Sequence, residues 1–270
     1  MWYATDVSRM RVLAHDPDHV LPAASVIKLL IARTLGDAVA GGELSLHSRV
    51  PLAIGDRVGG SDRFGNSPPG SYAVAELLAA MLSLSDNTAS NVLLRWLGKD
   101  RCNRRAAASG LRATRIRRRF FDWEAQRHGL ENTTTARESA NLLLELAACA
   151  REPGRRGVVA RASMNALLEQ SDRETIPAAL HRSGVANKTG ELPGIRNDVA
   201  IVGYGRQRSY VVSVMARYGA GRSSAIQAIR SLVRALDQRL GQGLQGAEAS
   251  QERGPSVTAS ALPAMEGAIH

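Results

Sequence analysis

The sequence predicts an α+β fold, in which helices cover an antiparallel sheet built from both chain ends and an all-α part is inserted between them. Two observations predict it. Extended patterns occur at the start of the chain and again over residues 184–218, whereas helical periodicity dominates the middle. The 270 residues, of which 44% are hydrophobic, suffice for one substantial core without disulfides. We expect an α/β part from 1–20 and 180–240, a helical part from 21–179, and a cleft where they meet.

The first elements are two short strands and a helix. The segments MWYATDV (1–7) and MRVLAHD (10–16) alternate loosely between polar and apolar residues, which is typical of strands joined by a polar turn. A helix is expected from about Ser25 to Gly41, because a glycine pair signals its end. Residues 55–71 are rich in Gly, Asp, Ser and Pro, so we expect a loop there.

Helical patterns fill the next part of the chain. Residues 73–98 predict two helices separated at SLSDN, because short Ser, Asp and Asn side chains compete for backbone hydrogen bonds. Two further helices are expected at 134–150, where threonines suit an N-cap, and at 161–170.

The C-terminal third returns to extended chain. Segments 184–190, 197–205 and 209–218 predict three strands spaced as an antiparallel meander. A last helix is expected at 223–240, because its apolar residues recur at the spacing of a helix that covers a sheet. Residues 241–270 are mostly small and polar without periodicity, which predicts a disordered tail.

The net charge of +10 comes almost wholly from arginine, since only Lys28, Lys99 and Lys188 are lysines among the 35 basic residues. Basic runs such as RIRRRFF (115–121) fit a solvated surface better than a nucleic-acid site. Only 4% of the residues are aromatic, and no nucleic-acid-binding module is recognisable. We therefore expect no nucleic-acid partner.

The sequence also argues against a membrane span, a metal site and a secretion signal in the chain as given. No apolar run approaches the roughly 18 residues that a membrane span requires, so we expect none. Cys102 and Cys149 lack metal-ligand spacing, so no metal is expected, and the sequence is compatible with both a disulfide and free thiols. The start has no basic segment followed by an apolar one, which predicts no secretion signal in the chain as given.

The first chemical pattern is a serine and a lysine three positions apart in PAASVIKLLIAR (22–33). On a helix, Ser25 and Lys28 lie one turn apart on one face, so the amine can approach the hydroxyl. A buried lysine has a lowered pKa and can act as a general base. The pattern is common, however, and by itself better fits a capping serine beside a lysine whose stem is buried.

Two further motifs change this interpretation. Ser85, Asp86 and Asn87 form S-D-N at the expected helix break, and K-T-G starts at Lys188 on an expected strand. The trio S-x-x-K, S-D-N and K-T-G is characteristic of class A β-lactamases and penicillin-binding proteins. In its motifs, their order and their approximate spacing, the chain resembles the class A β-lactamase-like serine hydrolase family over about residues 1–240.

The resemblance implies roles in acylation. Ser25 would be the acylated nucleophile, and Lys28 would receive its proton directly or through water. Ser85 would relay a proton to the leaving nitrogen, and Asn87 would hold the side-chain amide of the substrate.

The resemblance also implies substrate contacts on the K-T-G strand. Lys188 would attract a substrate carboxylate, Thr189 would hydrogen-bond it, and Gly190 would keep the strand edge open. The backbone N–H groups of Ser25 and Glu191 would form the oxyanion hole, worth about 3 to 4 kcal/mol per donor. Arg196 is a candidate further carboxylate anchor, and a surface arginine at a hairpin is an equal alternative.

One motif of the family is missing. Class A β-lactamases hold a glutamate in an E-x-x-L-N loop that activates the deacylating water. The matching stretch, Arg115 to Ala136, lacks this motif, and an ungapped comparison puts Phe120 where the glutamate belongs. Glu124 follows one helical turn later and is a candidate base together with Asp122, although both also fit as acids that neutralise neighbouring arginines.

We therefore expect a serine acyl-enzyme hydrolase that opens an amide, in the first instance a β-lactam ring, with slow deacylation. A D,D-peptidase, transacylase or esterase-like hydrolase of the same fold is the alternative. A non-catalytic ligand-binding protein is disfavoured, because it has no need of a complete proton-transfer set. We expect a monomer without cofactor, acting on a small β-lactam or a peptide-like carboxylate. The family is usually periplasmic or secreted, and a cytoplasmic location also fits the sequence given.

Overall fold

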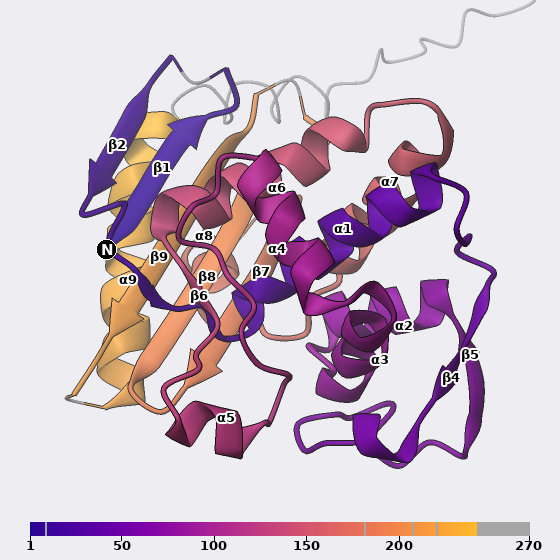
Figure 1. The fold of residues 1–270 in the computed structure, drawn as a ribbon. Coiled ribbons are helices and arrows are strands. Elements are labelled where there is room, and N and C mark those ends of the chain that lie inside the picture. The colour runs from indigo at the N-terminus through magenta and orange to yellow at the C-terminus, as the bar shows by residue number, and fades with distance from the viewer. Residues whose placement is uncertain (9, 181, 207, 220, 242–270) are drawn as a thin grey trace, which may run out of the picture.

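The computed structural model describes residues 1–8, 10–180, 182–206, 208–219 and 221–241 (Figure 1). The tail prediction for 242–270 lies outside the described residues. A sheet with covering helices lies beside a mainly helical part that includes the short strands β4 (Arg49–Leu52) and β5 (Gly70–Ala73) (Figure 1).

The central sheet has five antiparallel strands in the order β2-β1-β9-β8-β7. Its strands are β1 (Trp2–Asp6), β2 (Val12–His15), β7 (Val185–Leu192), β8 (Ile195–Val202) and β9 (Tyr210–Arg217). The N-terminal hairpin thus adds directly to the C-terminal meander, which confirms that both chain ends build one sheet. All eight residues of β8 are buried, because helices cover the sheet on both faces.

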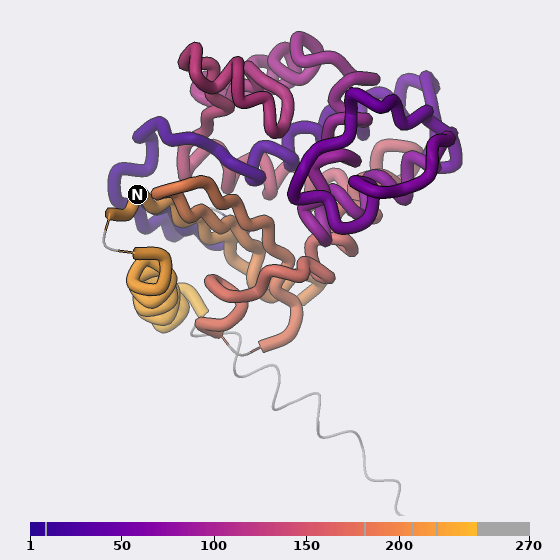
Figure 2. The backbone as a smooth tube through the Cα atoms, turned by 90° about the horizontal axis from the view of Figure 1, so that it is seen from below, coloured from indigo at the N-terminus to yellow at the C-terminus, as the bar shows by residue number. Residues whose placement is uncertain are grey.

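The two faces carry separate apolar clusters. On one face lie α8 (Ile176–Leu180) and α9 (Arg222–Leu240), and the tube view shows α9 alongside the strands (Figure 2). Residues Ala225, Ile229, Val233 and Leu236 of α9 recur at helical spacing and are buried. The other face packs against α6 (Ala136–Cys149), and α7 (Gly154–Leu168) contacts β7.

The helical part is centred on α1. This part comprises α1 (Lys28–Ala40), the 3-10 turn η1 (Ala24–Ile27) that precedes it, α2 (Val74–Ser83), α3 (Asn87–Leu97), α4 (Lys99–Ala108) and α5 (Trp123–Arg127). Eleven of the thirteen residues of α1 are buried, because α3, α4, α6 and α7 surround it. A lysine at its first position is therefore enclosed along with the apolar residues.

Several local predictions need correction. The predicted helix starts as the 3-10 turn η1 and becomes regular only at Lys28. The expected loop at 55–71 is flanked by a paired β4 (Arg49–Leu52) and β5 (Gly70–Ala73), and its first residues continue a 3-10 turn, η2 (Ile54–Asp56). Helix α7 begins before the predicted residue, and a two-stranded ladder joins β3 (Leu21–Pro22) to β6 (Thr133–Thr134).

The residues that flank Cys102 are helical in pattern, but no helix was bounded at α4 from the sequence, because KDRCNRRAAA buries only Cys102 and Ala106 and so lacks a wide apolar stripe. Cys102 and Cys149 are both buried free thiols, which settles the question that the sequence left open. Within the described ranges, no helix is both long and apolar enough to cross a bilayer, and no cluster of potential metal ligands occurs.

Candidate active site

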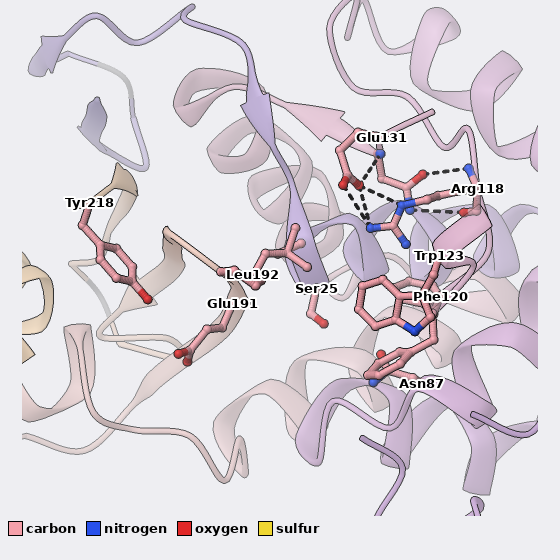
Figure 3. Close-up of a pocket in the computed structure, with 13 residues that line it drawn as sticks. Ser25, Asn87, Arg118, Phe120, Trp123, Glu131, Glu191, Leu192 and Tyr218 are labelled. Atoms are coloured by element: carbon pink, nitrogen blue, oxygen red, sulfur yellow. Dashed lines mark hydrogen bonds and ion pairs between the residues drawn. The ribbon is translucent and has the colours of Figure 1, made fainter. Parts of the chain in front are cut away.

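A pocket of about 470 Å³ opens where η1 meets the end of β7 and the loop that runs from 115 to 132. Ser25 lies between Glu191 and Leu192 on one side and Phe120 and Trp123 on the other (Figure 3). The full lining comprises Ala24, Ser25, Asn87, Arg118, Phe120, Phe121, Trp123, Glu131, Asn132, Glu191, Leu192, Pro193 and Tyr218.

The backbone around Ser25 is tightly constrained. Ala24 has a φ of 47°, a left-handed conformation that an alanine rarely adopts, and this places Ser25 at the start of the 3-10 turn. Strand β7 approaches so closely that a Cβ on Gly190 would lie 2.9 Å from the Ala23 oxygen and 3.1 Å from the Ser25 nitrogen. A side chain at this position would therefore collide with the turn that carries Ser25.

Lys28 is fully buried and bonded to the S-D-N turn. Its Nζ donates to the Ser85 carbonyl at 2.5 Å, and lies 3.0 Å from Ser85 Oγ and 2.8 Å from Asn87 Oδ1. Burial, and then the charge of Lys188, hold the pKa of the Lys28 amine well below its ordinary value, against the opposing effect of Asp86. An amine with a lowered pKa gives up its proton more readily, and in its neutral form it can accept one.

Ser85 sits between two lysines. Lys188 Nζ lies 3.1 Å from Ser85 Oγ and donates to the Thr189 carbonyl at 2.9 Å. Burial lowers the pKa of Lys188 to about 8, and the carboxylates of Asp172 and Asp198 limit the shift. The Ser85 hydroxyl therefore lies between two buried amines with lowered pKa values, of which Lys188 is still mostly charged at neutral pH.

The S-D-N turn is held by Asp86. Ser85 has a φ of 56°, and the buried Asp86 carboxylate caps α3 through the Ala89 N–H at 2.7 Å. The same carboxylate accepts from the N–H groups of Arg63 and Phe64, which fixes the loop before α2. The Asn87 amide also donates to the Gly60 carbonyl at 2.8 Å, so this side chain joins Lys28 to that loop.

The structure places Arg196 in the interior rather than on the surface. It is 1% exposed, and its guanidinium pairs with Glu191 at 2.6 Å and Asp172 at 2.8 Å. The alternative of a surface arginine is therefore wrong, because two acids from different segments enclose the guanidinium. Thr189 is also buried, on the same strand as Lys188 and Glu191.

Glu124 lies on α5 with its side chain exposed, and it is not part of the pocket lining. Phe120 takes the place next to Lys28 instead, with Nζ 4.8 Å from the ring centre. Asp122, the second candidate, caps α5 through the Ala125 N–H. Among the described residues, the carboxylates that do line the pocket are Glu131 and Glu191, and arginines pair with both.

The loop from 115 to 132 is positioned by two buried asparagines. Asn91 of α3 accepts from the Phe120 N–H at 3.0 Å and donates to the Phe120 carbonyl at 3.2 Å. The side-chain oxygen of Asn132 accepts from the backbone N–H of Arg118, and the backbone carbonyl of Asn132 accepts from the Ala23 N–H at 2.8 Å. These bonds hold Phe120 and the adjacent Phe121 beside the turn that contains Ser25.

Sequence reasoning missed five lining residues of this loop, namely Arg118, Phe121, Trp123, Glu131 and Asn132. Phe121 and Trp123 stack edge to face with centres 5.1 Å apart, and Arg118 pairs with Glu131 at 2.8 Å. The only available signal was the run RRRFFDW itself, which resembles an ordinary basic loop. Its path depends on partners in α3 that lie far away in sequence.

Known proteins resemble this chain in sequence and structure. The sequence model of the beta-lactamase enzyme family matches residues 1–240. The chain is 34% identical over 119 residues to D-alanyl-D-alanine carboxypeptidase DacB2 of Mycobacterium tuberculosis, a match that spans 42% of this chain and only 39% of that protein.

Two solved structures illustrate the similarity of fold. PBP-A is 24% identical with a TM-score of 0.80, over 89% of both chains. A β-lactamase from Sphaerobacter thermophilus DSM 20745 is 25% identical with a TM-score of 0.77, over 89% of this chain and 91% of that one. An acyl-enzyme complex of a PBP-A point mutant with penicillin G matches as well as PBP-A itself, with a TM-score of 0.80.

Proposed function

The chain belongs to the beta-lactamase enzyme family and is a serine hydrolase of this fold, and we propose that Ser25 is the nucleophile with which it opens a β-lactam ring. The observation that carries this proposal is the position of Ser85 Oγ, 3.0 Å from Lys28 Nζ and 3.1 Å from Lys188 Nζ. A ligand-binding site has no need of a hydroxyl between two buried amines, whereas proton transfer during acylation requires such a relay.

In the proposed acylation, the neutral Lys28 amine accepts the Ser25 proton, directly or through water, as Ser25 Oγ attacks the carbonyl carbon. The backbone N–H groups of Ser25 and Glu191 stabilise the oxyanion that forms. The C–N bond then breaks while the Ser85 hydroxyl protonates the leaving nitrogen. Lys28 returns a proton to Ser85 across their 3.0 Å contact, which leaves an ester on Ser25 and both relay groups in their starting states.

Lys188 assists this transfer by its charge. Its protonated amine lies 3.1 Å from Ser85 Oγ and lowers the proton affinity of that hydroxyl, which favours delivery to the leaving nitrogen. The same charge would attract a substrate carboxylate, with Thr189 beside it. Asn87 lines the pocket next to Ser25 and is assigned to the side-chain amide of the substrate.

We infer that deacylation is slow. The group beside Lys28 is the Phe120 ring, and the two carboxylates that line the pocket are paired with arginines. Both carboxylates already accept hydrogen bonds from these arginines, Glu131 from Arg118 and Glu191 from Arg196. Water in the pocket therefore lacks a well-placed group to activate it.

The same observation favours a second candidate, a D,D-peptidase or transacylase with identical acylation chemistry. In such an enzyme an amine or another acceptor, rather than activated water, releases the acyl group. The similarity to a D-alanyl-D-alanine carboxypeptidase supports this candidate, although it covers less than half of either chain.

Intact-protein mass spectrometry after mixing with penicillin G and with a cephalosporin separates these candidates. We expect a mass increase equal to the β-lactam, absent from Ser25→Ala, that decays over many minutes, with little loss of free β-lactam absorbance. Rapid decay with catalytic loss of substrate would instead indicate an efficient β-lactamase. Persistent labelling of the Ser25→Ala variant, or the absence of both an adduct and any loss of free β-lactam with the unaltered protein, would contradict the proposed β-lactam chemistry.

A further inference from the structure

A positively charged surface lies outside the pocket, on the helical part of the molecule. The segment from Arg95 to Arg119 contains ten basic residues and one acidic residue, Asp100, and it runs from the end of α3 through α4 into the loop 115–132. Helix α3 contacts both α4 and the 3-10 turn η2, so these elements form one continuous region. We call five of its side chains the basic surface, namely Arg95, Lys99, Arg115, Arg117 and Arg119.

The loop segment RIRRR (115–119) alternates between buried and outward side chains. Ile116 and Arg118 are buried, whereas the three arginines of the basic surface in this segment are partly or fully exposed. This alternation is that of extended chain, in which successive side chains point to opposite sides. Lys99 of α4 lies next to them, because its Nζ donates to the Arg117 carbonyl at 3.0 Å.

The turn η2 holds the other end of the basic surface. Its Asp56 is buried and pairs with Arg95 at 3.0 Å and with Arg119 at 2.7 Å, and each of these two arginines is still 38% exposed. Arg119 also donates to the Gly55 carbonyl at 3.0 Å. The buried carboxylate thus fixes one arginine from α3 and one from the loop on either side of the same turn.

Two large apolar side chains are exposed in this basic region. Ile54 precedes Gly55 in η2 and is 89% exposed, so it makes little contact with the protein core. Trp96 follows Arg95 in α3 and is 36% exposed. Single exposed apolar residues are common, but here both lie among side chains that keep a positive charge.

Most of that charge is not neutralised. Lys99, Arg115 and Arg117 donate to carbonyl or hydroxyl oxygens, and none of them takes part in an ion pair between described residues. The acids that oppose the five positive charges in this region are Asp56, which two arginines share, and Asp100 at the start of α4. The basic surface therefore attracts anions over its whole length.

We propose that the basic surface binds an anionic lipid membrane, with Ile54 in contact with the apolar region beneath the headgroups. Arginine forms paired hydrogen bonds with phosphate, and basic residues that surround an apolar side chain are typical of proteins that lie on a membrane. A soluble polyanion would engage the charges but would gain nothing from Ile54. The proposal concerns a surface outside the pocket and does not depend on the proposed function.

This surface and the pocket share one segment of the chain. Arg118 alternates with the outward arginines and lines the pocket. A molecule held through the basic surface would therefore keep its pocket close to the lipid, within reach of a substrate that is itself attached to the membrane.

The test is co-sedimentation of the full chain with phosphatidylcholine vesicles, with and without about 30% phosphatidylglycerol, at low salt. We expect the anionic vesicles to bind at least about tenfold more tightly, and about 0.5 M salt to remove most of this binding. Lys99→Gln combined with Arg117→Gln should weaken binding about tenfold. Ile54→Ser, which leaves the charge unchanged, should weaken it about threefold.

The matched control for charge is Arg234→Gln combined with Arg239→Gln, which removes two exposed arginines from α9 on the far face of the sheet (Figure 1). The control for Ile54 is Met10→Ser, because Met10 is 84% exposed and lies in the turn after β1. We expect less than about a twofold effect from either control.

Failure of the unaltered protein to bind anionic vesicles at low salt would overturn the proposal, whether or not every variant folds. So would equal weakening by the two pairs of arginine and lysine substitutions. Loss of binding in the charge variant with no effect of Ile54→Ser would overturn it too, and would assign the surface to a soluble polyanion. Acylation by penicillin G, a soluble substrate, should be unchanged in all these variants, so failure of the proposed function is seen separately.

Discussion

The two sides of the pocket are built in opposite ways. The motif side, formed by Ser25, Lys28, Ser85 and Lys188, consists of polar side chains, and Ser85 directly contacts both buried lysines. The loop side, residues 115–132, presents aromatic rings and a paired carboxylate, and asparagines clamp its backbone. In the proposed chemistry, acylation and water activation therefore depend on different segments. The pocket has the groups that acylation requires, and it has apolar rings where the activation of water requires a base.

The largest effect is expected on the motif side. Lys28→Ala should lower the rate of adduct formation with penicillin G about 10³-fold, because Ser25 loses its proton acceptor and Ser85 loses a relay partner. Stopped-flow or quenched mass spectrometry measures this rate. Lys99→Ala, which removes a lysine outside the pocket, should leave the rate unchanged. A Lys28→Ala rate within tenfold of the unaltered protein would break the assignment of the relay.

Phe120→Glu tests the loop side by placing a carboxylate where the pocket has an aromatic ring. A carboxylate in place of the ring, next to the Lys28 amine that now lies 4.8 Å from the ring centre, should shorten the adduct lifetime about 100-fold. The new charge also raises the pKa of Lys28, so acylation should become slower. Phe120→Gln controls for lost packing. An equal lifetime in both variants would show that the missing base is not the reason for slow release.

The pH dependence of acylation separates the two lysines. Lys188 loses its positive charge as the pH rises through about 8, so the acylation rate should fall about tenfold between pH 7 and pH 9. The pKa of Lys28 is also lowered, by burial and by the charge of Lys188. In Lys188→Arg the charge does not titrate, and the profile should be flat to pH 9 even if the rate is lower. An unchanged decline in that variant would assign the titration to another group.

The smallest effect concerns the rim of the loop side. Trp123 is 47% exposed and packs on Phe121, which makes an aromatic surface beside Ser25. Trp123→Ala should lower the acylation efficiency for penicillin G, which has a benzyl side chain, about fivefold relative to 6-aminopenicillanic acid, which has none. The ratio of the two efficiencies is the measurement. A ratio that does not change would mean that the benzyl group lies elsewhere.

The motif side could be predicted from the sequence, whereas the loop side could not. The order and spacing of three short motifs predict that Ser25, Lys28, Ser85 and Lys188 lie together. The structure brings both lysines within hydrogen-bonding distance of Ser85. That both chain ends contribute to one antiparallel sheet was equally accessible, because extended patterns occur at both chain ends.

The loop side depends on tertiary partners that no local pattern reveals. The path of Phe120 is set by Asn91, 29 residues away in sequence, and the burial of Arg196 is set by Asp172, 24 residues away. Glu124 was a reasonable candidate base from its place in the sequence alone. Its exposure follows from the position of α5, in which no residue is buried, and only the arrangement of the whole loop determines that position.

The two buried thiols can report how often the helices around them open. Burial raises the pKa of Cys102 to about 11 and also raises that of Cys149, so neither forms the reactive thiolate readily in the folded state. A thiol reagent should therefore label them only when the surrounding helices open, and the labelling rate measures how often that happens. In each variant above, one mass spectrum could then distinguish an altered pocket from a loosened fold, since the acyl adduct and the thiol label have different masses.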